Sequence, residues 1–296
     1  MKNIKVLLTS SGYLGGNTLV KYLKKTGERN IEVIGTDMNS NCAAKFYCDK
    51  FFITPPTKDR YFIPTLLEIC QKERPDVILP AGSYDIYPLA FHKKRFEDLG
   101  IKVMVSDLRT LEISLDKAET YHRLNGIVPL PRYFDSNKGF VIKPKEGKGG
   151  RGIEVFEKQG LIMEKMEGEE VDIDVLSYNG EVLLCVPKLR ERTYGGTLIE
   201  GKIVSRPYLF EQVKKIIQVI PIQFLSVPQF MGGKLLELNP RIAGAVPYFE
   251  GWNLPYLAIK LALNEITPAE VKVYQDKIPF GLKISRFLSQ IQYNNE

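Results

Sequence analysis

The residue types best suited to chemistry lie in the stretch LLELNPRIAGA, residues 235–245. Its alternation has the strand period of two, so Glu237 and Asn239 fall on one face of a predicted strand. A carboxylate that faces the core costs free energy unless it is paired or binds a metal. Pro240 ends the strand and brings Arg241 beside the two oxygen ligands. The spacing predicts a cation and a phosphate here; the alternative is an exposed strand end where Glu237 and Arg241 pair.

A second candidate is the glycine-rich segment VIKPKEGKGGRG, residues 141–152. An apolar strand ends at Lys143, and the loop that follows is basic and rich in glycine. Glycine permits close backbone approach, so several N–H groups can point at phosphate oxygens. The segment lacks the P-loop motif, and the alternative is a solvated hairpin. The glycines expected to approach phosphate are Gly147, Gly149, Gly150 and Gly152, and Lys145, Lys148 and Arg151 would supply positive charge.

A third glycine turn, SSGYLGGN at residues 10–17, follows the first predicted strand, and Asp37 ends the second. Together they resemble a dinucleotide-binding arrangement, but the spacing is G-x-x-G-G rather than G-x-G-x-x-G. Close packing of a strand on a helix explains these glycines better than a nicotinamide or flavin cofactor.

Other residue types offer less. His92 and His122 lie in helical surface patterns, where we expect structural roles. The four cysteines show neither C-x-x-C spacing nor a nearby histidine, so we expect buried free thiols rather than a zinc site or disulfides.

Composition narrows the class of protein. The 296 residues are 44% hydrophobic and 26% charged, as in a globular protein large enough for two cores. The net charge of +6 comes from interspersed residues, which suits an anionic ligand such as a nucleotide better than a nucleic acid. No apolar stretch approaches the ~20 residues of a membrane span, and the N-terminal apolar run predicts a strand. We expect a cytoplasmic protein that binds neither nucleic acid nor membrane.

The predicted order of strands and helices differs between two parts of the chain, and both parts must position these residues. Over residues 1–108 strands alternate with helices, which predicts an α/β domain with a parallel sheet covered on both faces. Beyond residue 108 a long helical stretch precedes strands, a glycine loop, further strands around a polar turn, and the hairpin that carries residues 222–239. This second part, residues 109–296, is predicted to be α+β.

Four motifs in this order resemble the ATP-grasp superfamily, and most closely its carbamoyl-phosphate synthetase large-subunit-like branch. They are SLDKAETYHRL, VIKPKEGKGGRG, IMEKMEGEEVDIDV and LLELNPR, and the likeness covers nearly the whole chain as a single unit. It implies a Rossmann-like pre-ATP-grasp domain over residues 1–108 and an ATP-grasp domain over 109–296. Within the latter, a small lid would span about 117–163 and a larger subdomain 164–296.

The resemblance implies a role for each matching residue. ATP would be bound through its phosphates by Lys117 and Lys143, the latter also near the adenine. The adenine would be framed by Glu164, Lys165 and Met166, and the ribose would be held by Glu170 or, alternatively, Glu169.

The resemblance also implies the metal site and its surroundings. Two Mg²⁺ ions, with Mn²⁺ as an alternative, would be bound by Gln223, Glu237 and Asn239, where Glu237 bridges both ions. Arg241 would stabilise the phosphoryl group in transfer. The basic run of Lys188, Arg190 and Arg192 would lie near the γ-phosphate and the substrate carboxylate; the alternative is a charged sheet face.

The function that follows is an ATP-dependent carboxylate–amine ligase. It would form an amide through an acyl phosphate and release ADP and phosphate. With one unit and no glutaminase-like segment, the chain is not expected to make carbamoyl phosphate alone. The alternatives are a kinase of a small acceptor and a non-catalytic nucleotide-binding regulatory subunit. Small-molecule carboxylate and amine substrates are expected, with Ser83, Tyr84 and Asp85 as candidate contacts, and a homodimer is left open.

Overall fold

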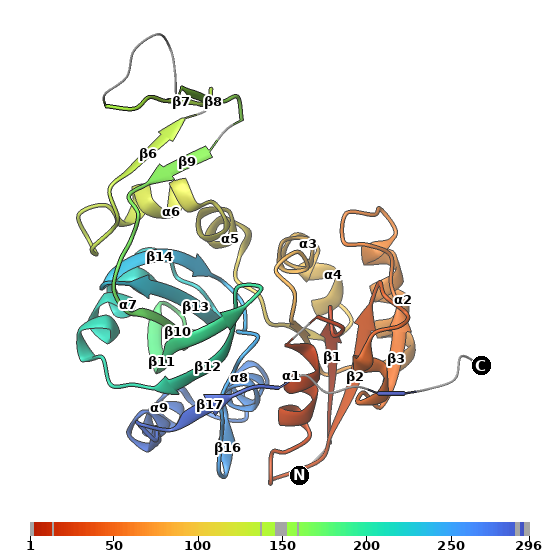
Figure 1. Ribbon diagram of the computed structural model, residues 1–296. Helices are drawn as coiled ribbons and strands as arrows, with labels where there is room; N and C mark the ends of the chain where they lie inside the picture. Colours follow the sequence, from red (N-terminus) through yellow and green to blue (C-terminus); the bar gives the residue numbers. More distant parts are fainter. Residues whose placement is uncertain are drawn as a thin grey trace.

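The computed structural model describes residues 3–13, 15–136, 138–145, 153–158, 160–287 and 291–292. Two sheets organise this part of the chain, and a pair of small hairpins stands apart from both (Figure 1). No helix in the described part of the chain is both long and apolar enough to cross a membrane.

The first sheet is parallel, with strand order β3-β2-β1-β4-β5. Its strands are β1 (Ile4–Thr9), β2 (Ile31–Asp37), β3 (Lys50–Ile53), β4 (Val77–Pro80) and β5 (Lys102–Val103). The central strands are mostly apolar and buried because helices cover both of their faces. Helix α1 (Gly16–Leu23) lies on the face turned toward the second sheet, and α2 (Phe62–Glu73) lies on the opposite face (Figure 1).

Further short helices complete the first domain and connect it to the second. Residues 86–97 form two helices that are separated at His92, α3 (Ile86–Phe91) and α4 (Lys93–Glu97), and η1 (Ala43–Phe46) is a short 3-10 turn. The stretch at 108–126 is also two helices, α5 (Leu108–Leu115) and α6 (Lys117–Leu124). Asp116 separates them because its carboxylate accepts from the backbone N–H groups of Ala118 and Glu119 and so begins a new helix.

The second sheet is antiparallel, with strand order β14-β13-β10-β11-β12-β17. Its strands are β10 (Glu170–Tyr178), β11 (Glu181–Tyr194), β12 (Thr197–Ile203), β13 (Phe224–Met231), β14 (Lys234–Asn239) and β17 (Lys283–Ser285). Helix α7 (Pro207–Val219) covers one face. Strand β11 runs further than expected, through the whole basic segment, before it turns into β12.

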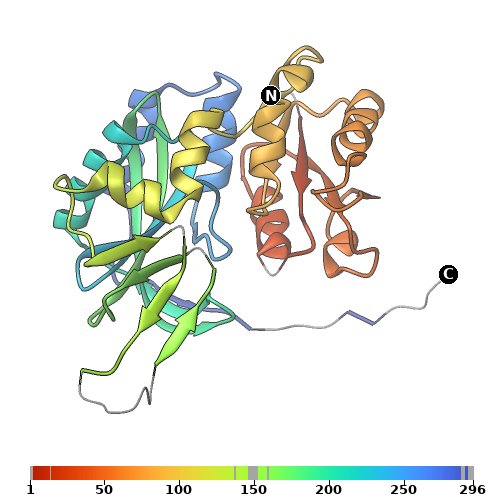
Figure 2. The ribbon, with the colours of Figure 1, turned by 90° about the horizontal axis from the view of Figure 1, so that it is seen from above.

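Two small hairpins project from this domain, above α6 in Figure 1 and to its side in Figure 2. One pairs β6 (Tyr133–Ser136) with β9 (Gly160–Met163), and the other pairs β7 (Phe140–Ile142) with β8 (Glu154–Phe156). Several apolar side chains on these strands are exposed, among them Phe134, Val141 and Val155. The hairpins therefore present apolar side chains to solvent, while Tyr133 of β6 packs against Tyr121 of α6 with 5.1 Å between the ring centroids.

The two domains share one hydrophobic core. Leu19, Val20 and Leu23 of α1 belong to the same buried cluster as Tyr256 and Leu257 of α8 (Leu254–Ala262). Salt bridges border it, since Arg29 pairs with Glu265 at 2.6 Å and Glu28 with Lys260 at 2.8 Å. The remaining elements around this core are β15 (Tyr248–Phe249), β16 (Trp252–Asn253), α9 (Pro268–Lys272) and η2 (Val273–Lys277).

Candidate functional site

The candidate site is one face of the antiparallel sheet. Along β10 the odd-numbered Val171, Ile173 and Val175 pack against α7 in a buried cluster, so the even-numbered residues face the other way. Those residues are acids: Glu170, Asp172 and Asp174. The register continues this polar face across the neighbouring strands, because Asp172 lies opposite Lys188 on one side and opposite Gln229 on the other. Gln229 in turn lies opposite Glu237 of β14.

Glu237 is held between two donors. Its Oε2 lies 2.9 Å from Lys117 Nζ, and its Oε1 accepts a hydrogen bond of 2.9 Å from Asn239 Nδ2. Partial burial acts to raise the pKa of Glu237, but the hydrogen bonds from Asn239 and Lys117 outweigh it and lower the pKa below its usual value. Glu237 is therefore a carboxylate at neutral pH. Its partner is Lys117 and not Arg241, which was the alternative pairing considered from the sequence.

Helix α6 positions both partners of the contact between Lys117 and Glu237. The Asp116 cap makes Lys117 the first residue of α6, beside the end of β14. One turn further on, the Tyr121 hydroxyl donates a 2.7 Å hydrogen bond to the Leu236 carbonyl oxygen, next to Glu237. Burial, with the charge of Glu237 nearby, raises the pKa of Tyr121 to about 12. The hydroxyl thus stays protonated and clamps α6 onto β14.

The prediction of Gln223 as the third metal ligand does not fit this geometry. Gln223 precedes β13, where its side-chain oxygen accepts from the Asn179 backbone N–H and its own N–H donates to Ser106. The residue of β13 opposite Glu237 is Gln229, whose amide donates to Glu170 Oε1. Regular counting back across the hairpin turn at residues 232–233 would have placed Pro228 opposite Glu237. A register shift between Gln229 and Phe230 brings Gln229 there instead, and the sequence gives no signal for that shift.

The basic run divides into two parts. Lys188 and Arg190 point into the polar face: Lys188 Nζ lies 2.7 Å from Asp174 Oδ2, and Arg190 Nη1 lies 3.0 Å from Asp172 Oδ1. Both side chains are almost fully buried, with 0% and 7% exposed. Arg192 is exposed and pairs with Glu200 across irregular pairing of β11 with β12. Lys188 and Arg190 therefore neutralise acids of the sheet face.

The Lys188–Asp174 pair lies where the polar face meets the shared core. Beyond Asp174, the same face of β10 continues with Leu176, a residue of that core. Burial raises the pKa of Asp174 to about 6, against the opposing effect of the Lys188 charge. Lys188 Nζ also donates to the Ala245 carbonyl oxygen at 3.1 Å. The pair thereby ties β10 and β11 to the loop that follows Arg241.

Arg241 connects the two domains. Its Nε donates to Ser83 Oγ, after β4, and its Nη1 donates to the Ile242 carbonyl oxygen at 2.8 Å. Of the other candidate contacts after β4, Tyr84 is exposed, whereas Asp85 is buried and accepts from Thr9 Oγ1 at 2.6 Å. Ser83 is thus the one of these three residues that the structure joins to the site.

The glycine turn after β1 serves packing. A Cβ on Gly16 would lie 1.8 Å from the Ser11 carbonyl oxygen, and one on Gly15 would lie 2.2 Å from the Tyr13 hydroxyl. Across the domain boundary, a Cβ on Gly244 would lie 2.7 Å from the same hydroxyl. The Asp37 carboxylate accepts from the Gly12 N–H at 2.8 Å. These glycines admit the Tyr13 ring between the domains.

The segment expected to frame adenine joins the hairpins to β10. Glu164 accepts from Lys234, and from Arg132 at 2.9 Å; these donors lower its pKa to about 2. Lys165 is exposed and Met166 is half-buried. Glu169 pairs with Arg206 at 2.6 Å, whereas Glu170 lies on the polar face with Arg190 3.2 Å away. Of the two candidates for the ribose, Glu170 shares the face of Glu237.

Lys143 is also predicted to contact a phosphate. Its side chain is exposed, directly after β7. Gly147, Lys148, Gly149, Gly150, Arg151 and Gly152 lie outside the described residues.

The donor set suits Mg²⁺. Around Glu237 the oxygen donors are one carboxylate and the amides of Asn239 and Gln229, and hard oxygen ligands are those that Mg²⁺ prefers. Among the described residues no three His, Cys, Asp or Glu side chains gather into a metal site, which leaves a mixed carboxylate–amide set. Such a set binds Mg²⁺ weakly unless phosphate oxygens complete the coordination.

Two family models match separate parts of the chain. A PylC-like N-terminal domain matches residues 6–104, and a domain described as ATP-grasp in the biosynthetic pathway with Ter operon matches residues 156–280. Carbamoyl-phosphate synthase from Methanobrevibacter smithii is 29% identical over 216 residues, which cover 62% of this chain and 56% of the relative. The carbamoyl phosphate synthase large chain of Clostridium perfringens is 24% identical over 287 residues, which cover 80% of this chain and 25% of that one.

The chain thus spans about half the length of the first relative and a quarter of the second. Among solved structures, biotin carboxylase from Campylobacter jejuni in a β,γ-ATP complex matches with a TM-score of 0.65 and 15% identity, over 95% of this chain and 74% of that chain. At this identity the match shows the fold. It confirms the predicted order of a parallel-sheet domain followed by an α+β domain built on an antiparallel sheet.

Proposed function

We propose that this chain, which matches an ATP-grasp family model over residues 156–280 and is similar to carbamoyl-phosphate synthase, is an ATP-dependent carboxylate–amine ligase. It would convert a small carboxylate into an acyl phosphate and then into an amide, with release of ADP and phosphate. The observation that carries the proposal is the polar sheet face, where Glu237, Asn239 and Gln229 adjoin Lys117.

The nucleotide would lie between the hairpins and this face. Gln229, Glu237 and Asn239 would hold Mg²⁺, which when bound neutralises charge on the phosphates. Lys117 neutralises Glu237 in the structure. Since its side chain is 60% exposed, it can turn from Glu237 to a phosphate oxygen without leaving a buried charge.

The polar face would act mainly by positioning. The Arg241 guanidinium, which Ser83 orients, would stabilise the phosphoryl group in transfer and the carboxylate that attacks it. Lys188 and Arg190 are committed to Asp174 and Asp172, so we assign them to holding the sheet face rather than to the substrate. Glu170 would accept from ribose hydroxyls. With little covalent chemistry for the protein to perform, alignment of carboxylate and phosphate supplies most of the rate.

Hydroxylamine provides the test, because it intercepts acyl phosphates as hydroxamates. The full chain is incubated with Mg-ATP, hydroxylamine and a panel of carboxylic acids, and hydroxamate, ADP and AMP are measured. We expect hydroxamate and ADP in equal amounts for the substrate acid, without AMP. Formation of AMP would indicate adenylation and contradict the proposal. A stable phosphorylated product that needs no amine would identify a kinase instead.

A further inference from the structure

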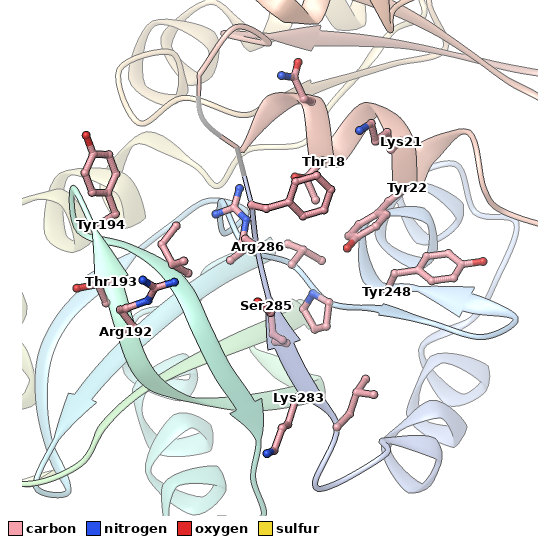
Figure 3. A pocket seen from close by; sticks show the side chains of 18 of the residues that line it. Thr18, Lys21, Tyr22, Arg192, Thr193, Tyr194, Tyr248, Lys283, Ser285 and Arg286 are labelled. Atoms are coloured by element: carbon pink, nitrogen blue, oxygen red, sulfur yellow. The ribbon is translucent and has the colours of Figure 1, made fainter. Parts of the chain in front are cut away.

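A second cavity adjoins the polar face on the side away from the hairpins. It has a volume of about 880 Å³ and lies between α1 of the first domain and β11, β17 and the loop Ala245–Tyr248 of the second. Figure 3 shows side chains from these elements converging on it: Lys21 and Tyr22 from α1, Arg192 and Tyr194 from β11, and Arg286 after β17. No described residue of the hairpins lines this cavity.

The charged side chains that line the cavity are all basic, although Arg192 is paired with Glu200, which does not line it. Lys21, Arg192, Lys283 and Arg286 line it, and no aspartate or glutamate is among its described lining residues. Arg286 is half-buried, which lowers its pKa from the usual arginine value, and its Nη1 donates to the Leu198 carbonyl oxygen at 3.3 Å. A cavity walled by low-dielectric protein focuses the field of such groups and attracts anions.

Several tyrosine side chains form part of the remaining wall. Tyr22, Tyr47, Tyr194 and Tyr248 line the cavity. The rings of Tyr22 and Tyr248 lie 5.3 Å apart between centroids, and the Lys21 ammonium lies 4.7 Å from the centroid of Tyr47. Tyrosine rings offer rigid apolar surface for a planar body, so this wall suits a ligand with a flat apolar part.

Tyr13 links the cavity to the reactive end of the site. Burial raises the pKa of its hydroxyl, and the positive charges of Arg241 and Arg286 both act in the opposite direction. The hydroxyl is buried without a hydrogen-bond partner among the described residues. Arg241 of the proposed phosphoryl site and Arg286 of the cavity therefore both lie near enough to the Tyr13 hydroxyl to act on it. Lys188, bonded to the Ala245 carbonyl oxygen, forms a second connection.

We infer that this cavity binds the carboxylate substrate, and that the substrate carries a second anionic group and a planar apolar body. This rests on the proposed ligase function and narrows its substrate class. The carboxylate to be activated would point to Arg241. The second anion, a carboxylate or a phosphonate-like group, would pair with Arg286, since Arg192 is held by Glu200. The planar body would lie against the tyrosines.

Titration calorimetry on the full chain without nucleotide tests the inference with four probes. Isophthalate and 3-phosphonobenzoate have a ring and two anionic groups, benzoate lacks the second anion, and glutarate lacks the ring. We expect the better of the two ring dianions to bind at least about tenfold more tightly than benzoate or glutarate, and the preferred one identifies the second anion. Equal affinity for benzoate and both ring dianions would overturn the inference.

Variants locate the binding. Arg286→Gln should reduce affinity for the preferred dianion to that for benzoate, and Lys21→Gln on the opposite wall should reduce it severalfold. Arg60→Gln, which removes an exposed arginine stacked on Tyr61 in the first domain, is the matched control and should bind like the wild type. If Arg286→Gln fails to fold by thermal unfolding, Lys21→Gln carries the test. Unchanged affinity in the folded cavity variants would overturn the inference.

Mg-ADP titrated into the same samples separates the two proposals. Mg-ADP binding without a preference for ring dianions would reject the cavity inference and leave the ligase proposal standing. A preference for ring dianions without Mg-ADP binding would support the cavity as an anion site and reject the ligase proposal.

Discussion

At the scale of single residues, the centre of the site is a carboxylate whose charge is kept by its neighbours. Glu237 has a lowered pKa despite partial burial, because Asn239 and Lys117 donate to it. Because the Glu237 carboxylate is ionised and partly accessible, it can exchange the Lys117 ammonium for a metal cation. Its neighbour across the hairpin, Gln229, can contribute an amide oxygen to the same cation.

Glu237→Gln keeps the shape of this side chain and removes its charge. We expect ADP release to fall on the order of a thousandfold, comparable to loss of a strong electrostatic contact in a transition state. The thermal unfolding midpoint should change little. Steady-state ADP release with saturating Mg-ATP is the measurement, and Glu200→Gln, which removes an acid paired with Arg192 on β12, is the control. Turnover within tenfold of the wild type would contradict the assignment.

Gln229 and Gln223 provide a matched pair. We expect Gln229→Ala to raise the Mg²⁺ concentration for half-maximal ADP release by about tenfold, as the loss of one metal contact does. Gln223→Ala should leave it unchanged, because Gln223 bonds Asn179 instead. Mg²⁺ titrations at fixed ATP decide between them, and the opposite ranking would restore Gln223 as the ligand.

At the scale of elements, the sequence predicted what local rules determine. Strand β2 appears at residues 31–37 as expected from its apolar run and flanking turns, and β14 ends before Pro240. Local sequence rules could not predict which strands pair with one another. The identity of Gln229, the burial of Lys188 and Arg190, and the two roles of the basic run all follow from which strands lie side by side. The cavity with Arg286 was also missed, because it joins residues more than 250 positions apart.

The ladder between β10 and β11 makes stability depend on pH through Asp174. In the folded protein this carboxyl keeps its proton up to about pH 6, whereas an unfolded chain releases it near pH 4. The folded state therefore binds more protons between these values, and the contribution of Asp174 to stability falls as pH rises from about 4 to about 6.

Asp174→Asn removes this titration. The free energy of unfolding of the wild type, relative to that of the variant, should decrease as pH rises through that window. Lys188→Met, which removes the charge that lowers the pKa of Asp174, should move the window to higher pH. Urea unfolding from pH 4 to 8 measures both. A difference that is independent of pH would contradict the raised pKa.

The entry into α1 gives a prediction about packing. Gly16→Ala would place a Cβ 1.8 Å from the Ser11 carbonyl oxygen, a backbone atom that cannot move without disturbing the turn after β1. We expect a loss of about 1–3 kcal/mol or more in the free energy of unfolding. Gly27→Asn is the control, since Gly27 has open space and a left-handed φ of 74° that asparagine tolerates. Equal stability of the two variants would show that the turn can relax.

At the scale of the whole molecule, the shared core makes two domains one folding unit. Leu257 of α8 lies in the same buried cluster as Val20 of α1. Leu257→Ala should cost about 2–5 kcal/mol, and calorimetry should show a single transition that shifts as a whole. The calorimetric and van't Hoff enthalpies should agree. A separate early transition for either domain would contradict a common core.

The cavity between α1 and β17 also has a consequence for kinetics. Its described walls belong to the shared-core body and to β11 and β17, and none belongs to the hairpins beside the proposed nucleotide site. The proposed nucleotide and acid would then enter through separate openings, so that neither ligand blocks access to the site of the other. A dead-end analogue of either substrate should therefore be competitive with that substrate and noncompetitive with the other, as in random addition. An analogue that is uncompetitive with one of the two substrates would indicate ordered addition and contradict this prediction. The cavity should fill as readily before the nucleotide arrives as after it.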